Sequence, residues 1–130
     1  MIKKSTAISV LFVVAALYDG LLGLAFLCGA DAVFKWAQVT PPNHLGYVQF
    51  PAALLIVFAI MFLAIARKPR ENRRLISYGM MLKVSYAGVV VYHWSASGIP
   101  NLWKPFAVFD MVFFALFALA YLSLDKHKTT

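Results

Sequence analysis

Apolar residues along this chain are gathered in four long runs, and the short stretches between the runs hold most of the charged residues. Each run is about 20 residues or slightly longer, which is the length that an α-helix needs to cross a hydrocarbon core about 30 Å thick. The pattern therefore predicts four membrane-spanning helices. We place them at residues 6–28, 47–66, 75–94 and 105–124.

The connections between these runs are short, which predicts a simple fold. Consecutive helices joined by short segments become neighbours, so we expect an all-α, up-down bundle of four antiparallel helices that forms one transmembrane domain over residues 1–130. Turn residues such as Pro41, Pro42 and Pro100 account for the chain reversals. A lid over an outward-facing cavity is the functional alternative for the segments that contain them.

The composition agrees with a membrane environment. Of the 130 residues, 62% are hydrophobic and 13% are charged. A soluble core of this size could not bury so much apolar surface, whereas lipid requires no such covering. The net charge of +7 would suggest nucleic acid in a soluble protein, but here the basic residues lie between apolar runs. We therefore expect membrane lipids as partners and no nucleic acid.

The distribution of lysine and arginine predicts how the helices are oriented. Nine of the twelve basic residues flank one face of the bundle, namely Lys3, Lys4, Arg67, Lys68, Arg70, Arg73, Arg74, Lys126 and Lys128. Lys35 and Lys104 flank the other face, where an aromatic belt is formed by Trp36, Tyr47, Tyr92, Trp94 and Trp103. The positive-inside rule therefore places both termini in the cytoplasm. We expect the membrane to be a bacterial inner membrane.

Three ionisable residues fall inside the predicted spans: Asp19 in the first, Lys83 in the third and Asp110 in the fourth. A charged side chain there costs at least about 2.5 to 3.5 kcal/mol on insertion scales, so each needs a partner or water. At a rise of about 1.5 Å per residue, the three lie roughly 14, 16 and 8 Å below the same boundary. We therefore expect a cluster of these three side chains that faces the bundle interior.

The neighbours of these residues on the same helix faces support that placement. Asp19 shares its face with Gly23, and Lys83 shares its face with Gly79. Small residues of this kind let membrane helices approach one another closely. Tyr86 is one helical turn from Lys83 and completes the candidate site.

Two interpretations of this candidate site stay open. In the first, Asp19, Lys83 and Asp110 form a buried ion pair with a spare carboxylate, which sets the register of the helices. In the second, they line a polar cavity together with Tyr86, and the cavity holds a ligand headgroup, a quinone or a proton path. We predict no catalytic residue and no bound cofactor, with a quinone or a lipid as the candidate ligand.

The histidines offer only a weak pattern for metal binding. His44 lies in the first outer segment and His93 near the end of the third span, so both belong to the outer surface. A metal site or an axial haem ligand would use such residues, but the chain has no CxxCH or HxxxH motif. We predict no metal site. His44 and His93 are interpreted as interfacial residues and His127 as part of a solvated tail.

Five segments spread over most of the chain share a pattern with a known family. They are LYDGLLGLAF, YVQFPAALLI, RKPRENRRL, MLKVSYAGVV and WKPFAVFDMVFFALF. Together they resemble the DoxX-like group of small four-helix bacterial membrane proteins. The resemblance implies a four-helix membrane fold and, from some members of the group, an association with quinone-linked sulfur oxidation or with larger membrane complexes. It implies no catalytic residue.

The sequence lacks the enzyme signatures that carry soluble chemistry, including the phosphate loop, the dinucleotide fingerprint, GxSxG and HExxH. We therefore expect a non-catalytic module, either an accessory subunit of a larger assembly or a small protein that binds lipid or another hydrophobic ligand. Its expected protein partners are other membrane subunits or further copies of itself in a homo-oligomer. The alternative is a quinone-interacting oxidoreductase subunit. A third hypothesis is an oligomeric, proton-coupled small transporter.

Overall fold

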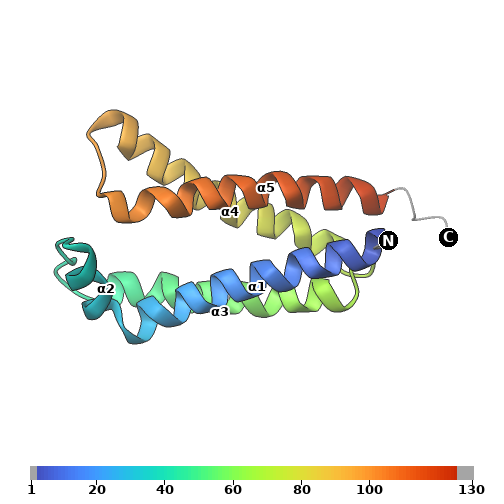
Figure 1. Cartoon of the computed structure of the whole chain (residues 1–130), viewed down its shortest axis with the longest axis horizontal. Coiled ribbons are helices and arrows are strands. Elements are labelled where there is room, and N and C mark those ends of the chain that lie inside the picture. Colours follow the sequence, from blue (N-terminus) through green and yellow to red (C-terminus); the bar gives the residue numbers. More distant parts are fainter. Residues whose placement is uncertain (1–2, 126–130) are drawn as a thin grey trace.

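The computed structural model describes residues 3–125, and helices are the only regular secondary structure in that range (Figure 1). The elements are α1 (Lys4–Cys28), α2 (Ala30–Ala37), α3 (Gly46–Arg67), α4 (Arg73–Ala96), the 3-10 helix η1 (Asn101–Trp103) and α5 (Lys104–Asp125). Lys126, His127 and Lys128, which contribute to the predicted basic face and tail, lie outside the described residues.

The prediction of an all-helical chain with four long apolar helices is confirmed. Each predicted run lies within one helix, and the helices α1, α3 and α4 are long and apolar enough to cross a membrane, as is the segment made of η1 and α5. The predicted ends differ from the observed ends by two residues or fewer. Length and composition along the chain were therefore sufficient to locate these helices.

The expectation of only four helices was incomplete, because the connection between α1 and α3 contains the additional short helix α2. Its Ala30 and Phe34 are buried one turn apart, and the Phe34 ring lies 6.1 Å from the ring of Phe26 on α1. The helix ends at Gln38, which adopts a left-handed conformation with φ of 57°. A helix of eight residues is too short to cross a membrane, so a search for apolar runs of membrane-crossing length does not detect it.

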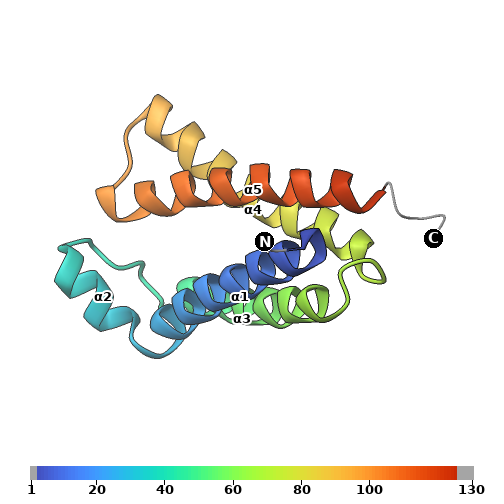
Figure 2. The same ribbon diagram turned by 45° about the vertical axis from the view of Figure 1, so that its right-hand side comes forward.

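The long helices associate as two pairs, α1 with α3 and α4 with α5, which Figures 1 and 2 show from two directions. A glycine allows the close approach of the first helix pair. A Cβ atom added at Gly23 would lie 2.7 Å from the backbone oxygen of Ala52, so no larger residue fits without moving α1 away from α3. The predicted small-residue face of α1 therefore packs against α3.

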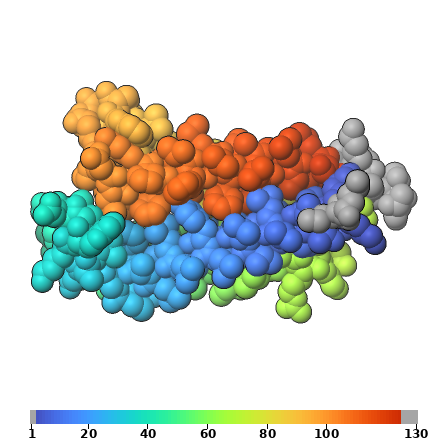
Figure 3. All heavy atoms as spheres, viewed as in Figure 1, coloured from blue at the N-terminus to red at the C-terminus, as the bar shows by residue number. Residues whose placement is uncertain are grey.

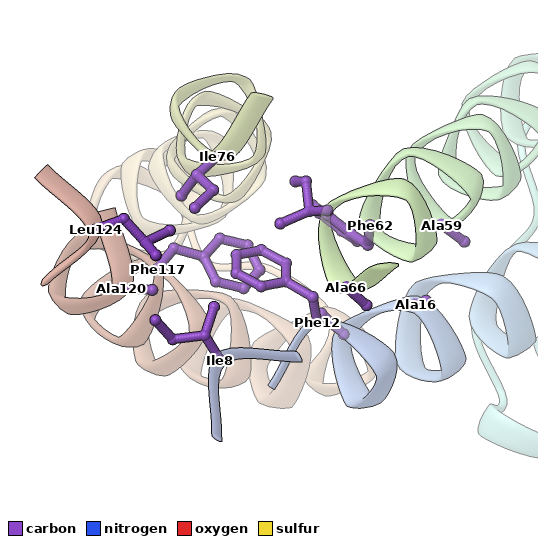
Figure 4. Packing of buried hydrophobic residues seen from close by; sticks show 12 residues of the cluster. Ile8, Phe12, Ala16, Ala59, Phe62, Ala66, Ile76, Phe117, Ala120 and Leu124 are labelled. Carbon is purple, nitrogen blue, oxygen red and sulfur yellow. The ribbon is translucent and has the colours of Figure 1, made fainter. Parts of the chain in front are cut away.

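The two helix pairs meet through a core of buried rings toward the start of α1 and the end of α5. We call Phe12, Phe62 and Phe117 the aromatic core; all three are completely buried (Figure 4). The Phe117 ring lies 4.6 Å from Phe12 and 5.3 Å from Phe62 between centroids. On α4, Gly79 lies against this core, because a Cβ atom there would approach the Phe62 ring to 2.7 Å.

The outer surface of the long helices is apolar. Large hydrophobic side chains are exposed on every long helix, among them Leu21, Ile60, Val89 and Leu119. The space-filling view shows α1 and α5 meeting along one face of an elongated body (Figure 3). Such a surface is unfavourable in water and matches hydrocarbon, as expected for helices that contact lipid.

Candidate functional site

The ammonium group of Lys83 lies between two carboxylates at the centre of the structure. Its Nζ donates hydrogen bonds of 2.9 Å to both carboxylate oxygens of Asp19 and one of 3.1 Å to Oδ1 of Asp110. Lys83 is completely buried, and the two aspartates are also buried. We call these three residues the charge cluster. The structure thus brings together the three ionisable residues that the sequence places at one level of the membrane.

The hydrogen bonds of the charge cluster use all the donors that a lysine has. A protonated amine carries three N–H groups, and three bonds are made. Asp110 receives only one of them, at Oδ1, and its side chain keeps 9% of its surface exposed against 2% for Asp19. Asp19 is therefore the main counterion of Lys83, and Asp110 is the carboxylate with more acceptor capacity left.

The charge cluster also joins the two helix pairs. Lys83 on α4 and Asp19 on α1 belong to different pairs, whereas Lys83 and Asp110 belong to the same pair. By contrast, Ser9 bonds the carbonyl of Ala66 within the first pair. The ion pair therefore fixes the position of one helix pair relative to the other, as the register interpretation requires.

Aromatic rings surround the ammonium group. The Nζ of Lys83 lies 4.9 Å from the ring centroid of Phe113, 5.2 Å from Tyr18 and 5.9 Å from Phe62. These distances allow cation–π attraction, which is strongest where water is excluded. Sequence analysis missed Tyr18 and Phe113, although each is close in sequence to an aspartate of the charge cluster. The Tyr18 hydroxyl is buried, and within the described part of the chain it has no hydrogen-bond partner.

Tyr86 does not bond to the charge cluster. Its hydroxyl donates a hydrogen bond of 2.8 Å to the backbone oxygen of Trp103, which connects α4 to η1. Trp103 in turn packs against Phe26 and Phe34, with centroid distances of 5.6 and 6.0 Å. Tyr86 therefore ties the second outer segment to α4, and Trp103 connects that segment to α1 and α2.

A cavity of about 490 Å³ lies between the helix pairs on the side of the charge cluster toward α2. We call it the central cavity. It is lined by Asp19, Leu22, Phe26, Tyr47, Val48, Pro51, Ala52, Leu54, Leu55, Phe58, Leu82, Ser85, Tyr86, Val89, Trp103, Phe106 and Asp110. Most of these side chains are apolar or aromatic, and the two carboxylates form its most polar part. Trp103 places the connection between α4 and α5 in the cavity wall.

A second hollow of about 340 Å³ lies between α4 and α5. The stem of Lys83 contributes to its wall, together with Val84, Ala87, Gly88, Val91, Met111 and Phe114. A Cβ atom added at Gly88 would meet no atom within 4 Å. Lys83 thus approaches this second hollow, whereas Asp19 and Asp110 line the central cavity.

The histidines make local contacts. Nδ1 of His44 accepts a hydrogen bond of 3.0 Å from the backbone N–H of Gly46, and its ring packs edge-on against Tyr47. His93 packs edge-on against Tyr92. Among residues 3–125 no group of three histidine, cysteine, aspartate or glutamate side chains is arranged to hold a metal ion.

No protein-family model, curated protein or solved structure matches this chain. The function therefore has to be inferred from the charge cluster and the central cavity.

Proposed function

We propose that this chain is a small polytopic membrane protein that binds a hydrophobic ligand in the central cavity, as a non-catalytic module of a bacterial inner membrane. The four long apolar helices support the membrane location. The juxtaposition of a largely apolar cavity with two buried carboxylates carries the proposal of a ligand. An apolar chamber with a few convergent polar groups is the usual form of a small-molecule site.

The proposed topology is an up-down bundle with both termini in the cytoplasm. Figure 1 supports it, because the start of α1 and the end of α5 lie at the same end of the molecule. The basic connection between α3 and α4 lies at that end. The helix α2, the start of α3 and the end of α4 lie toward the other end, and they carry the exposed aromatic residues Trp36, Tyr47 and Tyr92. This asymmetry is the one that the positive-inside rule and the interfacial aromatic belt require.

A purely structural ion pair explains the cavity poorly. Burial of a lysine between carboxylates would fix helix register equally well in a densely packed bundle. Here the space next to the carboxylates stays open, although Leu55, Phe58 and Leu82 on its walls could fill it with small helix shifts. An open apolar space beside polar groups favours an occupant.

A photoactivatable, uncharged fatty alcohol tests this proposal in lipid nanodiscs. We expect crosslinks to the cavity wall at Leu55 and Phe58, in addition to the lipid-facing Leu119. The variant Val89→Trp places a large ring on the cavity wall at a position whose side chain is already 59% exposed. It should remove the crosslinks to the cavity wall and leave those to Leu119 unchanged.

The matched control is Val112→Trp, a similarly exposed position on α5 that lines neither hollow. It should leave both sets of crosslinks unchanged. A ligand site would be refuted if crosslinks form only at lipid-exposed residues such as Leu119. In that case Leu55 and Phe58 would give no signal, and Val89→Trp would have no effect.

A quinone-binding subunit is the second candidate. The aromatic walls of the central cavity favour it, since Phe26, Trp103 and Phe106 could stack on a planar headgroup. The module would then work with a partner subunit that carries the redox chemistry. Displacement of the fatty-alcohol probe by a short-chain quinone at a concentration that leaves Leu119 labelling unchanged would support this candidate.

A further inference from the structure

The polar part of the central cavity offers hydrogen-bond acceptors and few donors. Six side chains with polar atoms line the cavity: Asp19, Tyr47, Ser85, Tyr86, Trp103 and Asp110. The Ser85 hydroxyl donates to the backbone oxygen of Met81 at 2.7 Å, and the Tyr86 hydroxyl donates to that of Trp103 at 2.8 Å. Because a hydroxyl has one proton to donate, these two donors are committed within the protein. The remaining donors on the wall are the hydroxyl of Tyr47, which is largely exposed, and the indole N–H of Trp103, and the buried polar groups of the wall are the two carboxylates.

The charge balance of the site also favours a positively charged ligand over a negatively charged one. Lys83 directs all three N–H groups to the aspartates and does not line the central cavity. Two carboxylates therefore share one ammonium group, and Asp110 keeps more acceptor capacity than Asp19, because no hydrogen bond reaches its Oδ2. When both carboxylates are ionised, the charge cluster carries one net negative charge beside the cavity.

The walls add a second attraction for positive charge. The rings of Phe26, Phe58, Tyr86, Trp103 and Phe106 line the cavity, and the faces of such rings attract cations in water-poor surroundings. The ligand that complements this site is an apolar molecule with one positive charge or one strong hydrogen-bond donor.

We infer that the central cavity binds lipophilic monocations, such as hydrophobic amines, with the charge held by Asp110. This inference rests on the proposed function and names the class of its ligand. It also separates the two candidates at Asp110, because the oxygens of an oxidised quinone accept hydrogen bonds and would face an acceptor there. Asp110 acts here as a binding residue and Lys83 as the group that holds it in place.

Two ions of matched shape test the inference in the same crosslinking assay. Tetraphenylphosphonium and tetraphenylborate have nearly the same size and apolar surface but opposite charge. We expect the cation to displace the fatty-alcohol probe from Leu55 and Phe58 at a concentration at least about tenfold lower than the anion. Labelling of Leu119 corrects for the different partitioning of the two ions into lipid.

The variant Asp110→Asn keeps an oxygen that accepts a hydrogen bond from Lys83 but removes the negative charge. In this variant, the concentrations of cation and anion that displace the probe should differ by less than about threefold. Asp31→Asn, at an exposed position on α2, is the matched control and should keep the wild-type preference. Circular dichroism and gel filtration check that both variants fold.

Each outcome decides one of the two proposals. Labelling of the cavity wall with equal displacement by both ions overturns the inference about charge and leaves ligand binding intact. A preference for the cation that survives in Asp110→Asn overturns the role of Asp110. Absence of cavity labelling in the wild-type protein overturns the proposed function itself. If Asp110→Asn does not fold, the comparison of the two ions on the wild-type protein still decides the inference.

Discussion

Toward the start of α1 and the end of α5, buried rings fill the space between all four long helices, whereas toward α2 the same helices leave a partly open cavity of about 490 Å³. Phe12, Phe62 and Phe117 occupy the filled half. The open half is bounded by partly exposed side chains such as Phe106 and Val89. Figure 1 shows the corresponding divergence, with α4 moving away from α1 and α3 toward the α2 end.

The charge cluster lies at the boundary between these halves. The Lys83 ammonium group lies 5.9 Å from the ring of Phe62 in the aromatic core, and Asp19 and Asp110 line the central cavity. One half therefore holds the helix pairs together, and the other contains the space that the proposed ligand would occupy. This division places the polar groups where a firm scaffold supports them, as a binding site requires.

Removal of the Lys83 ammonium group should have the largest effect on stability. Lys83→Met leaves two buried carboxylates without their ammonium partner, and we expect a loss of about 3 to 5 kcal/mol in the free energy of unfolding. Titration with sodium dodecyl sulfate in mixed micelles, followed by circular dichroism, measures it. Lys35→Met, at an exposed position on α2, is the control and should change the stability by less than about 0.5 kcal/mol.

The same unfolding measurement can separate two causes of the stability loss in Lys83→Met: the lost attraction between the helix pairs and the cost of burying unpaired carboxylates. The triple variant Lys83→Met, Asp19→Asn, Asp110→Asn should recover part of the loss, because no uncompensated carboxylate remains. A stability of Lys83→Met within 1 kcal/mol of wild type would contradict the importance of the cluster as a connection between the helix pairs.

Truncation of matched phenylalanines on α5 should reveal the difference between the halves. Phe117→Ala creates a void among fully buried rings, and we expect it to cost about 3 kcal/mol. Phe106→Ala only enlarges an existing cavity and should cost about 1 kcal/mol. Both are measured by the same unfolding titration. Equal losses would show that the open half is packed as tightly as the filled half.

Addition of a single methyl group to α4 gives the smallest and most local comparison. Gly79→Ala places a Cβ atom 2.7 Å from the Phe62 ring, so overpacking should cost about 1 to 3 kcal/mol. Gly88→Ala on the same helix meets no atom within 4 Å and should be neutral or stabilising by up to about 1 kcal/mol. Thermal unfolding monitored by gel filtration ranks the two variants. A neutral Gly79→Ala would contradict close packing of α4 on the aromatic core.

The sequence by itself determined the four long helices and the common level of Asp19, Lys83 and Asp110. Both follow from properties that can be measured along the chain, namely the length of an apolar run and the rise of a helix per residue. The short helix α2 was missed because spans were sought by length. Its buried Phe34 is explained by packing with Phe26 and Trp103.

Only the tertiary structure decided that the four long helices divide into two pairs, with much less contact between α3 and α4 than within each pair. It also decided that Tyr18 and Phe113 surround the ammonium group and that Tyr86 bonds to Trp103 in η1. The central cavity also emerged only there. The physical reason is that lipid-facing and core-facing side chains of a membrane helix are similarly apolar, so periodicity does not distinguish them. Which face meets another helix, and where a space remains, depends on the fit of side chains that are distant in sequence.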